Sequence, residues 1–254
     1  YNVAIGFTAG LAVTTGVQNT LIGGLAGDAL TDADMNVAIG YLALTSDTLG
    51  SRSIAIGMNS LQAQNFTTAT DTYNVAVGHN AGAEVTTGVQ NTLIGGLAGD
   101  ALNTSNNNVA IGYQALSTDV KGTKTVAIGY QALFDQNFST NTDTYNVAVG
   151  YLAGANVTTG VQNTIIGGLA GDALTTGHDN VAIGISALST EDTGSETVAI
   201  GRSALFTQNA GAVDTYNVAV GAAAGRLVTT GVQNTIIGGL AGDALTDADN
   251  NVAI

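Results

Sequence analysis

The feature that most constrains this chain is a five-residue motif that recurs along its whole length. The motif reads NVAIG at Asn2–Gly6 and Asn36–Gly40, NTLIG at Asn19–Gly23 and SIAIG at Ser53–Gly57. It closes on Gly6, Gly23, Gly40, Gly57, Gly78, Gly95, Gly112, Gly129, Gly150, Gly167, Gly184, Gly201, Gly221 and Gly238. Successive glycines are 17 residues apart, except that every fourth step is 20 or 21 residues. A 17-residue unit is therefore nested in a super-repeat of four units.

The motif predicts a short strand followed by a corner. In Val3-Ala4-Ile5 the β-branched residues share one face and Ala takes the other, and the glycine suits a turn or a close backbone approach. No apolar run has helical spacing. Stacked coils with paired parallel strands satisfy a strand repeated at constant spacing, so we predict an all-β parallel β-solenoid (β-roll) with 17-residue rungs. Its structural ladder positions include Asn2, Gly6, Asn19, Gly23, Asn36, Gly40, Asn108 and Gly112.

The repeats predict one continuous array over residues 1–254. Its super-repeats run over approximately 2–73, 74–145 and 146–216, and 217–254 is a partial one. Tyr1 aligns with the last residue of a long unit, and Ile254 stops one residue before a motif glycine. We therefore expect a fragment of a longer chain, or segments that stack end to end as a filament.

The predicted core is narrow. Each rung supplies about three sizeable aliphatic side chains, for example Val37, Ile39 and Leu44. The small residue three positions after each motif glycine, Ala or Ser, suggests a place where another chain approaches closely. Because a subunit that cannot bury its apolar face must bury it in a partner, we favour a homotrimeric fibre over a monomeric solenoid, which remains the alternative.

The composition excludes several classes of protein. Five Lys and Arg against 19 Asp and Glu give a formal net charge of −14, so the basic footprint of a nucleic-acid binder is missing. Without cysteine there is no disulfide framework and no thiolate zinc site. No apolar run approaches the roughly 18 residues of a membrane helix, so we expect no membrane insertion by this segment.

Few residues suit catalysis or metal binding. His79 and His178 lie in different units, with no repeated acid or nucleophile beside them, so we expect no enzymatic activity and no cofactor. Calcium is the one ion to consider, because hard cations prefer oxygen-rich loops. The weak candidates lie in two acidic corners: Asp28, Asp32, Asp34, Asp243, Asp247 and Asp249. Solvated turn residues are the favoured interpretation of both corners.

The long fourth units are the most suggestive surface feature. They read QNFTTATDTYN from Gln64, QNFSTNTDTYN from Gln136 and QNAGAVDTYN from Gln208. Extra residues in one rung of a solenoid bulge outward, often on the binding face. The surface-binding candidates are Phe66, Phe138, Tyr73 and Tyr145 in these units, and Tyr113 and Tyr130 in the row that follows the motif glycine. Exposed rings suit sugar faces, but packing of the rings against a neighbouring chain is the favoured interpretation.

The pattern NVAIGxxAL, at Asn36–Leu44 and Asn108–Leu116, resembles the head repeat of trimeric autotransporter adhesins (the YadA-like head). Similar repeats occur in bacteriophage tail fibres. The resemblance implies a left-handed, trimeric β-roll in an extracellular protein at a cell surface or on a virion. It implies a structural stalk or head that presents contacts to a host-cell glycan or protein. A glycan-binding (lectin-like) module or a self-assembling extracellular filament are the alternatives. Ice binding is less favoured, because the threonine pair of VTTGVQNT recurs only once in four rungs.

Overall fold

The computed structural model describes all 254 residues and contains only short β-strands joined by turns. It divides into two compact units. The first comprises residues 1–124 and 138–142, and the second comprises residues 125–137 and 143–254. No helix that could cross a lipid bilayer is present.

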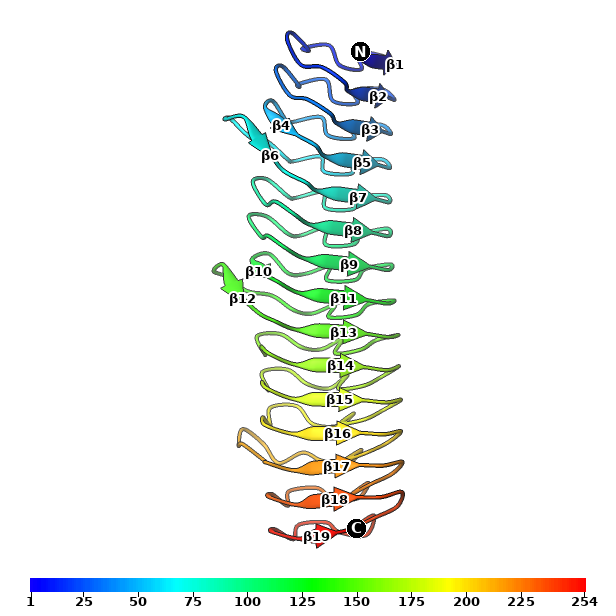
Figure 1. The fold of residues 1–254 in the computed structure, drawn as a ribbon, viewed down its shortest axis with the longest axis vertical. Helices are drawn as coiled ribbons and strands as arrows, with labels where there is room; N and C mark the ends of the chain where they lie inside the picture. The colour runs from blue at the N-terminus through cyan, green and yellow to red at the C-terminus, as the bar shows by residue number, and fades with distance from the viewer. The chain divides into compact units, whose positions relative to one another are not determined.

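The first unit stacks seven motif strands in one parallel sheet, drawn one above another in Figure 1. They are β1 (Val3–Ile5), β2 (Thr20–Ile22), β3 (Val37–Ile39), β5 (Ile54–Ile56), β7 (Val75–Val77), β8 (Thr92–Ile94) and β9 (Val109–Ile111). The corner strands are β4 (Gly50–Ser51), β6 (Thr70–Asp71) and β10 (Gly122–Thr123). Val3 pairs with Thr20, which pairs with Val37, so like motif positions lie directly over one another.

The second unit repeats this arrangement with eight strands. They are β11 (Val126–Ile128), β13 (Val147–Val149), β14 (Thr164–Ile166), β15 (Val181–Ile183), β16 (Val198–Ile200), β17 (Val218–Val220), β18 (Thr235–Ile237) and β19 (Val252–Ala253). The two-residue strand β12 (Thr142–Asp143) holds the last residue of the first unit's 138–142 segment and the first residue of the second unit's longer segment. Every pairing in the second unit is parallel. The predicted parallel β-solenoid with rungs of 17 residues is thereby confirmed.

The rungs are held together by the motif asparagines. Asn19 is completely buried; its Nδ2 donates to the carbonyl of Ala33, 14 residues on, at 2.7 Å. Its Oδ1 accepts the backbone N–H of Asn36 in the next rung at 2.9 Å. Asn2 and Asn36 make the same two kinds of bond, and Asn108 is held likewise by Asn91 and by the carbonyl of Gly122. Each asparagine thus closes its own rung and fixes the next, as the predicted ladder requires.

The core lies on the other side of the strand from the one expected. Ala38, at the centre of its strand, is fully buried together with Leu44, whereas Val37 and Ile39 are only half-buried and point outward. In a three-residue strand the side chains alternate, so only the central one enters the rung. Leu44 fills the remaining space from a turn position with φ of 54°. The expectation that Val37 and Ile39 belong to the core was wrong.

The small residues after each motif glycine also pack within the chain. Ala26, Ala43 and Ala98 are completely buried in the single chain, so they do not mark the approach of another one. The core volume is balanced between rungs. Where the central strand residue is Leu21, the turn position carries Gly27, and a Cβ there would lie 2.8 Å from Leu21 Cδ2. Where it is Ala38, the same position carries Leu44.

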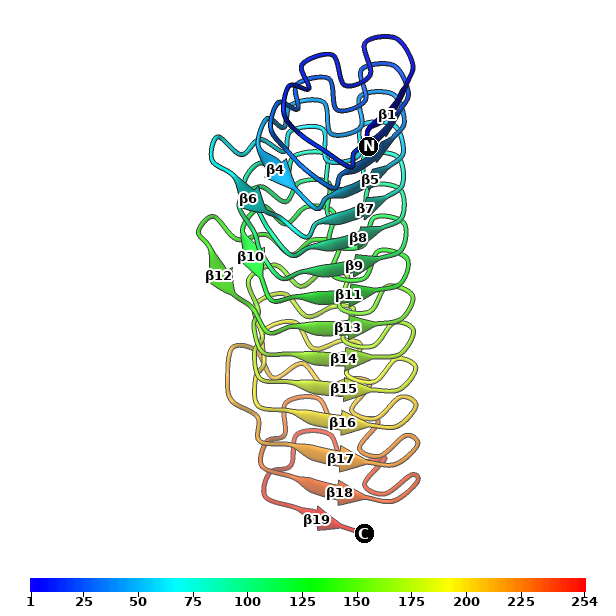
Figure 2. The same cartoon turned by 45° about the horizontal axis from the view of Figure 1, so that its top comes forward.

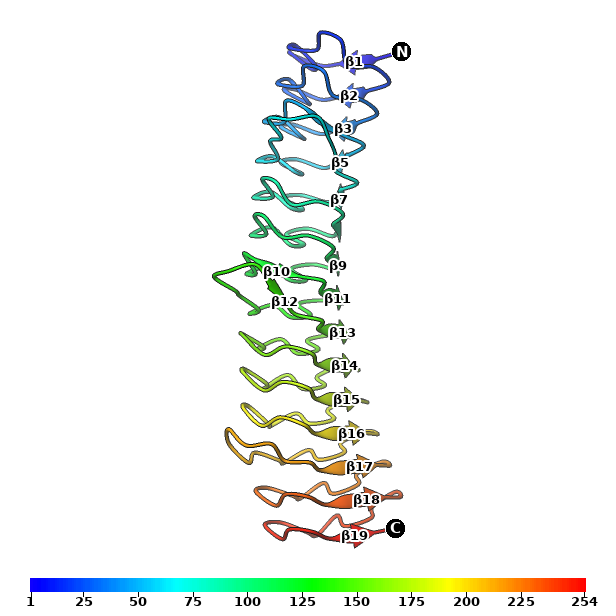
Figure 3. The same ribbon diagram turned by 60° about the vertical axis from the view of Figure 1, so that its left-hand side comes forward.

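The long rungs bulge outward, as predicted. Figure 1 shows the loop that carries β6 extending beyond the turns of neighbouring rungs. Figure 2, turned toward the end of the stack, shows the ordinary rungs of each unit following one outline. Figure 3 shows the loop before β17 reaching farther out than the loops before β16 and β18. The extra residues therefore leave the strand register of each unit unchanged.

The motif glycines allow the rungs to approach closely. A Cβ on Gly150, whose φ is +144°, would lie 2.5 Å from the carbonyl oxygen of Gly167 in the next rung. Gly211, in a long-rung loop with φ of +73°, has nothing within 4 Å of the same position.

We predict that Gly150→Ala lowers the free energy of unfolding by at least about 3 kcal/mol. The new Cβ would collide with the backbone of the next rung, and alanine would also be strained at this positive φ. Gly211→Ala is the matched control, and it should cost only the conformational penalty of about 1–2 kcal/mol. Urea denaturation followed by circular dichroism measures both. Equal losses in the two variants would contradict the close approach.

Candidate functional site

The long rungs place their two kinds of aromatic residue differently. Phe66 and Phe138 are each only 7% exposed, so their rings lie inside the corner and are not available as a binding surface. Tyr73, Tyr145 and Tyr216 close the long rungs and are 51%, 52% and 53% exposed. Of the long-rung candidates, only the tyrosines are presented to solvent.

Beneath these corners lies a buried polar network that sequence reasoning missed. Asp47 is fully buried; its Oδ1 accepts the backbone N–H groups of Gly50 and Phe66, both at 3.0 Å. Its Oδ2 accepts a hydrogen bond from Gln64 Nε2 at 2.6 Å. Gln64 Nε2 also donates to Ser53 Oγ at 2.8 Å, and Gln64 Oε1 accepts Asn74 Nδ2 at 2.8 Å. Every polar group in this part of the core has a partner.

This network replaces the asparagine ladder where the motif lacks asparagine. Ser53 stands at the asparagine position of its rung, and its hydroxyl is too short to close the rung as an amide does. The longer side chain of Gln64 closes this rung instead. It donates a hydrogen bond to Ser53 and accepts one from Asn74 of the next rung. Glu191, Gln208 and Thr197 repeat the arrangement in the third super-repeat, where Gln208 Nε2 donates to Glu191 Oε2 at 3.0 Å and to Thr197 Oγ1 at 3.1 Å. The signal in the sequence was the glutamine that opens each long segment.

Burial raises the pKa of two carboxyl groups, and a neighbouring charge raises that of one tyrosine. Removal from water raises the pKa of Asp47 above 3.8, although the N–H groups of Phe66, Gln64 and Gly50 oppose the shift. Burial likewise raises the pKa of Asp100, which accepts the hydroxyl of Ser117 at 2.5 Å. At the surface, the negative charge of Asp214 raises the pKa of the Tyr216 hydroxyl.

The exposed tyrosines form two separate groups. Tyr73 donates to Asp71 Oδ2 at 3.4 Å, and Arg52 bridges the pair with its Nε 2.9 Å from Asp71 Oδ1 and its guanidinium 5.9 Å from the ring centroid. In the row after the motif glycine, Tyr130 and Tyr151 stack with centroids 5.3 Å apart and an interplanar angle of 14°.

Tyr113 lies in the same kind of row in the first unit. It is about half exposed, and its ring covers Gly96, where an added Cβ would lie 3.5 Å from Tyr113 Cδ2. The glycines of this row thus leave room for the ring of the next rung.

The acidic corners use their carboxylates to hold neighbouring rungs. Asp34 accepts the N–H of Val17 at 2.7 Å, and Asp249 accepts the N–H of Val232 at 2.8 Å. Asp28, Asp32 and Asp247 accept threonine hydroxyls, from Thr45, Thr15 and Thr246 respectively. Only the side chain of Asp243 has no such bond. The structure contains no group of three acidic or histidine side chains that could hold a metal ion.

His178 lies in a shallow pocket of about 190 Å³ with Ser195 and Asp214. Its Nδ1 is 2.8 Å from Asp179 Oδ2, but Ser195 Oγ accepts the backbone N–H of His178 at 3.1 Å and makes no bond to the ring. The geometry is therefore that of a corner contact and not of a base beside a nucleophile.

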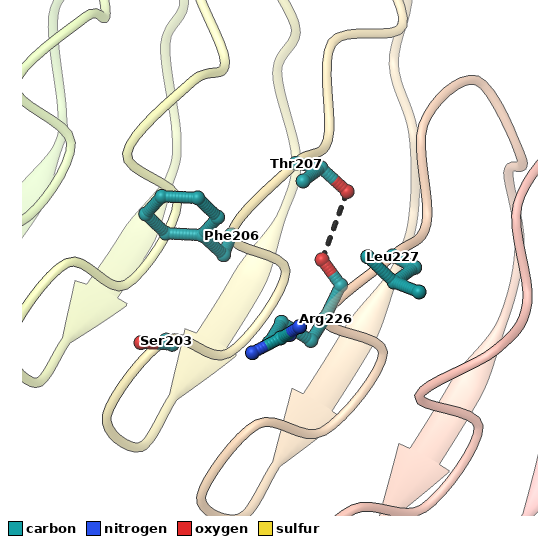
Figure 4. Close-up of a pocket in the computed structure, with 5 residues that line it drawn as sticks. All are labelled: Ser203, Phe206, Thr207, Arg226 and Leu227. Atoms are coloured by element: carbon teal, nitrogen blue, oxygen red, sulfur yellow. Dashed lines mark hydrogen bonds between the residues drawn. The ribbon is translucent and has the colours of Figure 1, made fainter.

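A larger pocket of about 240 Å³ lies in the second unit, between the long rung and the rung after it. Ser203, Phe206, Thr207, Arg226 and Leu227 line it (Figure 4). Thr207 Oγ1 donates to the carbonyl of Arg226 at 2.8 Å, which joins the two rungs at the pocket wall. Sequence reasoning did not identify this site, because its residues differ between the super-repeats.

Comparisons of the chain with protein-family models, with curated proteins and with solved structures found no match.

We predict that Asp47→Asn destabilises the protein by about 1–3 kcal/mol, because the new amide places a donor against the donor Gln64 Nε2. Adding Gln64→Glu restores an acceptor opposite that amide, so the double variant should regain part of the loss. Urea midpoints of the two single variants and the double variant form the cycle that measures this coupling. Additive losses would contradict a direct Asp47–Gln64 interaction.

The raised pKa of Asp47 gives a pH dependence with a definite sign. The folded protein binds a proton at Asp47 more readily than the unfolded chain does, so this group adds stability as the pH falls through its folded pKa. The gain is complete below the ordinary value of 3.8. The free energy of unfolding of the wild type, relative to that of Asp47→Asn, should therefore rise between pH 7 and pH 4. A relative fall over that range would contradict the direction of the shift.

Proposed function

We propose that the chain is a non-enzymatic structural segment of an extracellular fibre at a cell surface or on a virion, of the kind found in trimeric autotransporter adhesin heads and bacteriophage tail fibres. The observation that carries the proposal is the constant register of the rungs. Val75 pairs with Thr92, and Val147 pairs with Thr164, in equivalent rungs of successive super-repeats. A stack built this way changes length by whole super-repeats without changing its cross-section.

The outer face of the sheet supports self-association as a homotrimer. The strand residues beside the buried central one are apolar or threonine, and Ile94, Ile166 and Ile237 are each more than a third exposed. Aliphatic columns repeated on successive strands form a flat apolar strip, and surfaces of this kind mark protein contacts. The net charge of −14 keeps the remaining surface soluble and disfavours binding to nucleic acid.

Glycan binding is the second candidate function. The stacked pair Tyr130 and Tyr151 and the half-exposed Tyr113 and Tyr145 offer ring faces to solvent. Such rings suit the apolar faces of sugars at a host-cell surface.

The modular role predicts that a whole super-repeat can be removed. Deletion of residues 74–145 joins Tyr73 to Asn146, which recreates the Tyr145–Asn146 junction. This variant should fold with an unchanged β-sheet circular dichroism signal per residue. Deletion of residues 79–154 is the control. It joins Gly78 to Ala155 and shortens an ordinary 17-residue rung by four residues, so the asparagine ladder loses its register and cooperative unfolding should be lost. Equal behaviour of both deletions would exclude the modular role.

The homotrimer predicts a definite mass in sedimentation equilibrium. The wild type should sediment as three chains at micromolar concentration. Ile94→Lys with Ile166→Lys should dissociate the trimer, because a charge is placed in each apolar strip. Thr67→Lys, at an exposed loop position, is the matched control and should leave the mass unchanged. A wild type that sediments as a monomer would count against the trimer and leave the modular role standing.

A further inference from the structure

The pocket between the third long rung and the rung after it stands on a backbone that all three super-repeats share. Thr207 N donates to the carbonyl of Arg226 at 3.2 Å. The equivalent bonds join Asp135 to Ala155 and Ala63 to Ala83, both at 2.9 Å. The three sites can therefore be compared side chain by side chain.

The side chains at this position change character at the third long rung. Arg226 stands where the rungs after the first two long rungs have Ala83 and Ala155. Thr207 stands where the second long rung has Asp135.

Leu227 stands where the rungs after the first and second long rungs have Glu84 and Asn156. An alanine position has thus become basic, and two neighbouring positions that are acidic at another long rung have become neutral, in a chain that has only five Lys and Arg.

Arg226 is placed to bind an anion. Its side chain is exposed, and no carboxylate of the chain forms an ion pair with it, whereas Arg52 is paired with Asp71. Figure 4 shows the guanidinium extending from its rung toward the side of the pocket where Ser203 and Phe206 lie. A guanidinium can hold a carboxylate through two parallel hydrogen bonds.

The other walls suit a hydroxylated ring. The hydroxyl hydrogen of Thr207 is used by the carbonyls of Arg226 and Val228, at 2.8 and 3.0 Å, so its oxygen is left to accept a hydrogen bond. Ser203 also lines the pocket. The partly exposed Phe206 and the exposed Leu227 line the rest of it. A cation, two hydroxyl-bearing residues and an aromatic residue together match a saturated ring that carries a carboxylate and hydroxyl groups.

We propose that this pocket binds a carboxylated sugar residue, such as a uronic or sialic acid. The volume of about 240 Å³ lies below the roughly 300–1,000 Å³ of pockets for drug-sized ligands, so it takes one sugar residue. The proposal rests on the glycan-binding candidate, not on the fibre role, and a single chain suffices to form the site.

Titration of the ¹⁵N-labelled protein with glucuronate and with N-acetylneuraminate, followed by NMR, tests the proposal. Saturable shifts should appear at residues 203–207 and 226–227. Arg226→Gln should weaken binding about tenfold or more, because a charge-assisted bond is lost. Arg52→Gln, which removes an arginine outside the pocket, is the control and should leave binding unchanged. Absence of saturable shifts, or equal binding by Arg226→Gln, would overturn the proposal.

Two further arms define the ligand class. Glucose lacks the carboxylate and cyclohexanecarboxylate lacks the hydroxyls, so each should bind at least several-fold more weakly than glucuronate. Equal binding of either compound would overturn the assignment to a carboxylated sugar.

A transplanted site provides a gain of function. Gln131→Ser, Asp135→Thr, Ala155→Arg and Asn156→Leu together reproduce the pocket's side chains beside Phe134. This variant should show a second set of shifts at residues 131–135 and 155–156. Shifts confined to the original site in a folded variant would contradict the assignment of recognition to these side chains. The fibre role is tested separately by the deletion and sedimentation measurements.

Discussion

The rest of the structure depends on one side chain acting in two directions. A buried asparagine such as Asn163 donates across its own rung to Gly177 and accepts the N–H of Asn180 in the next rung. Neither bond competes with water, because the side chain is fully buried. The first bond sets the circumference of the rung and the second sets its register. A strand of three residues is too short to pair stably alone, so this repeated amide supplies what strand length does not.

The narrow interior determines which side chains follow. Three rungs in every four supply one large aliphatic group near the strand, either from the strand, as Ile165 with Gly171 opposite, or from the turn, as Leu188 with Ala182 opposite. The remaining rung has Ala76 and Gly82 at these positions, and Leu61 and Leu93 of the adjacent rungs fill the space. Volume-conserving exchanges of this kind keep a core packed while the sequence varies. The β-branched strand residues are left outside, and they give the sheet an apolar outer surface that its own chain does not cover.

The architecture could be predicted from the sequence because the period is a property of the whole chain. Spacing, parallel pairing, the ladder at Asn36 and the outward bulges at the long rungs all follow from which residues recur, and the structure confirms them. Which face of the strand enters the core could not be predicted. Val37 and Ile39 are larger and more apolar than Ala38, and only the turn geometry at Leu44 reveals that the interior is already filled. Phe66 in a polar loop was likewise placed at the surface, because its burial depends on the backbone bond to Asp47. The pocket at Arg226 was missed since a search for repeats emphasises what recurs, and this site is made of residues that do not.

The buried Asp47 and Gln64 also bear on how such a chain avoids misfolding. Nearly identical repeats can pair in the wrong order, and the wrong stack would satisfy most backbone bonds. In each super-repeat, two of the four rungs carry a polar side chain, such as Asp47 or Gln64, at a core position where the other two carry an aliphatic one, such as Val85 or Leu102. A slip by one or two rungs would set a buried carboxylate against an aliphatic wall, without its glutamine or its N–H donors. Only a displacement by a complete super-repeat avoids that penalty, and it must leave about seventy residues looped out. The buried polar residues therefore specify a single stacking order for rungs whose sequences are otherwise nearly identical.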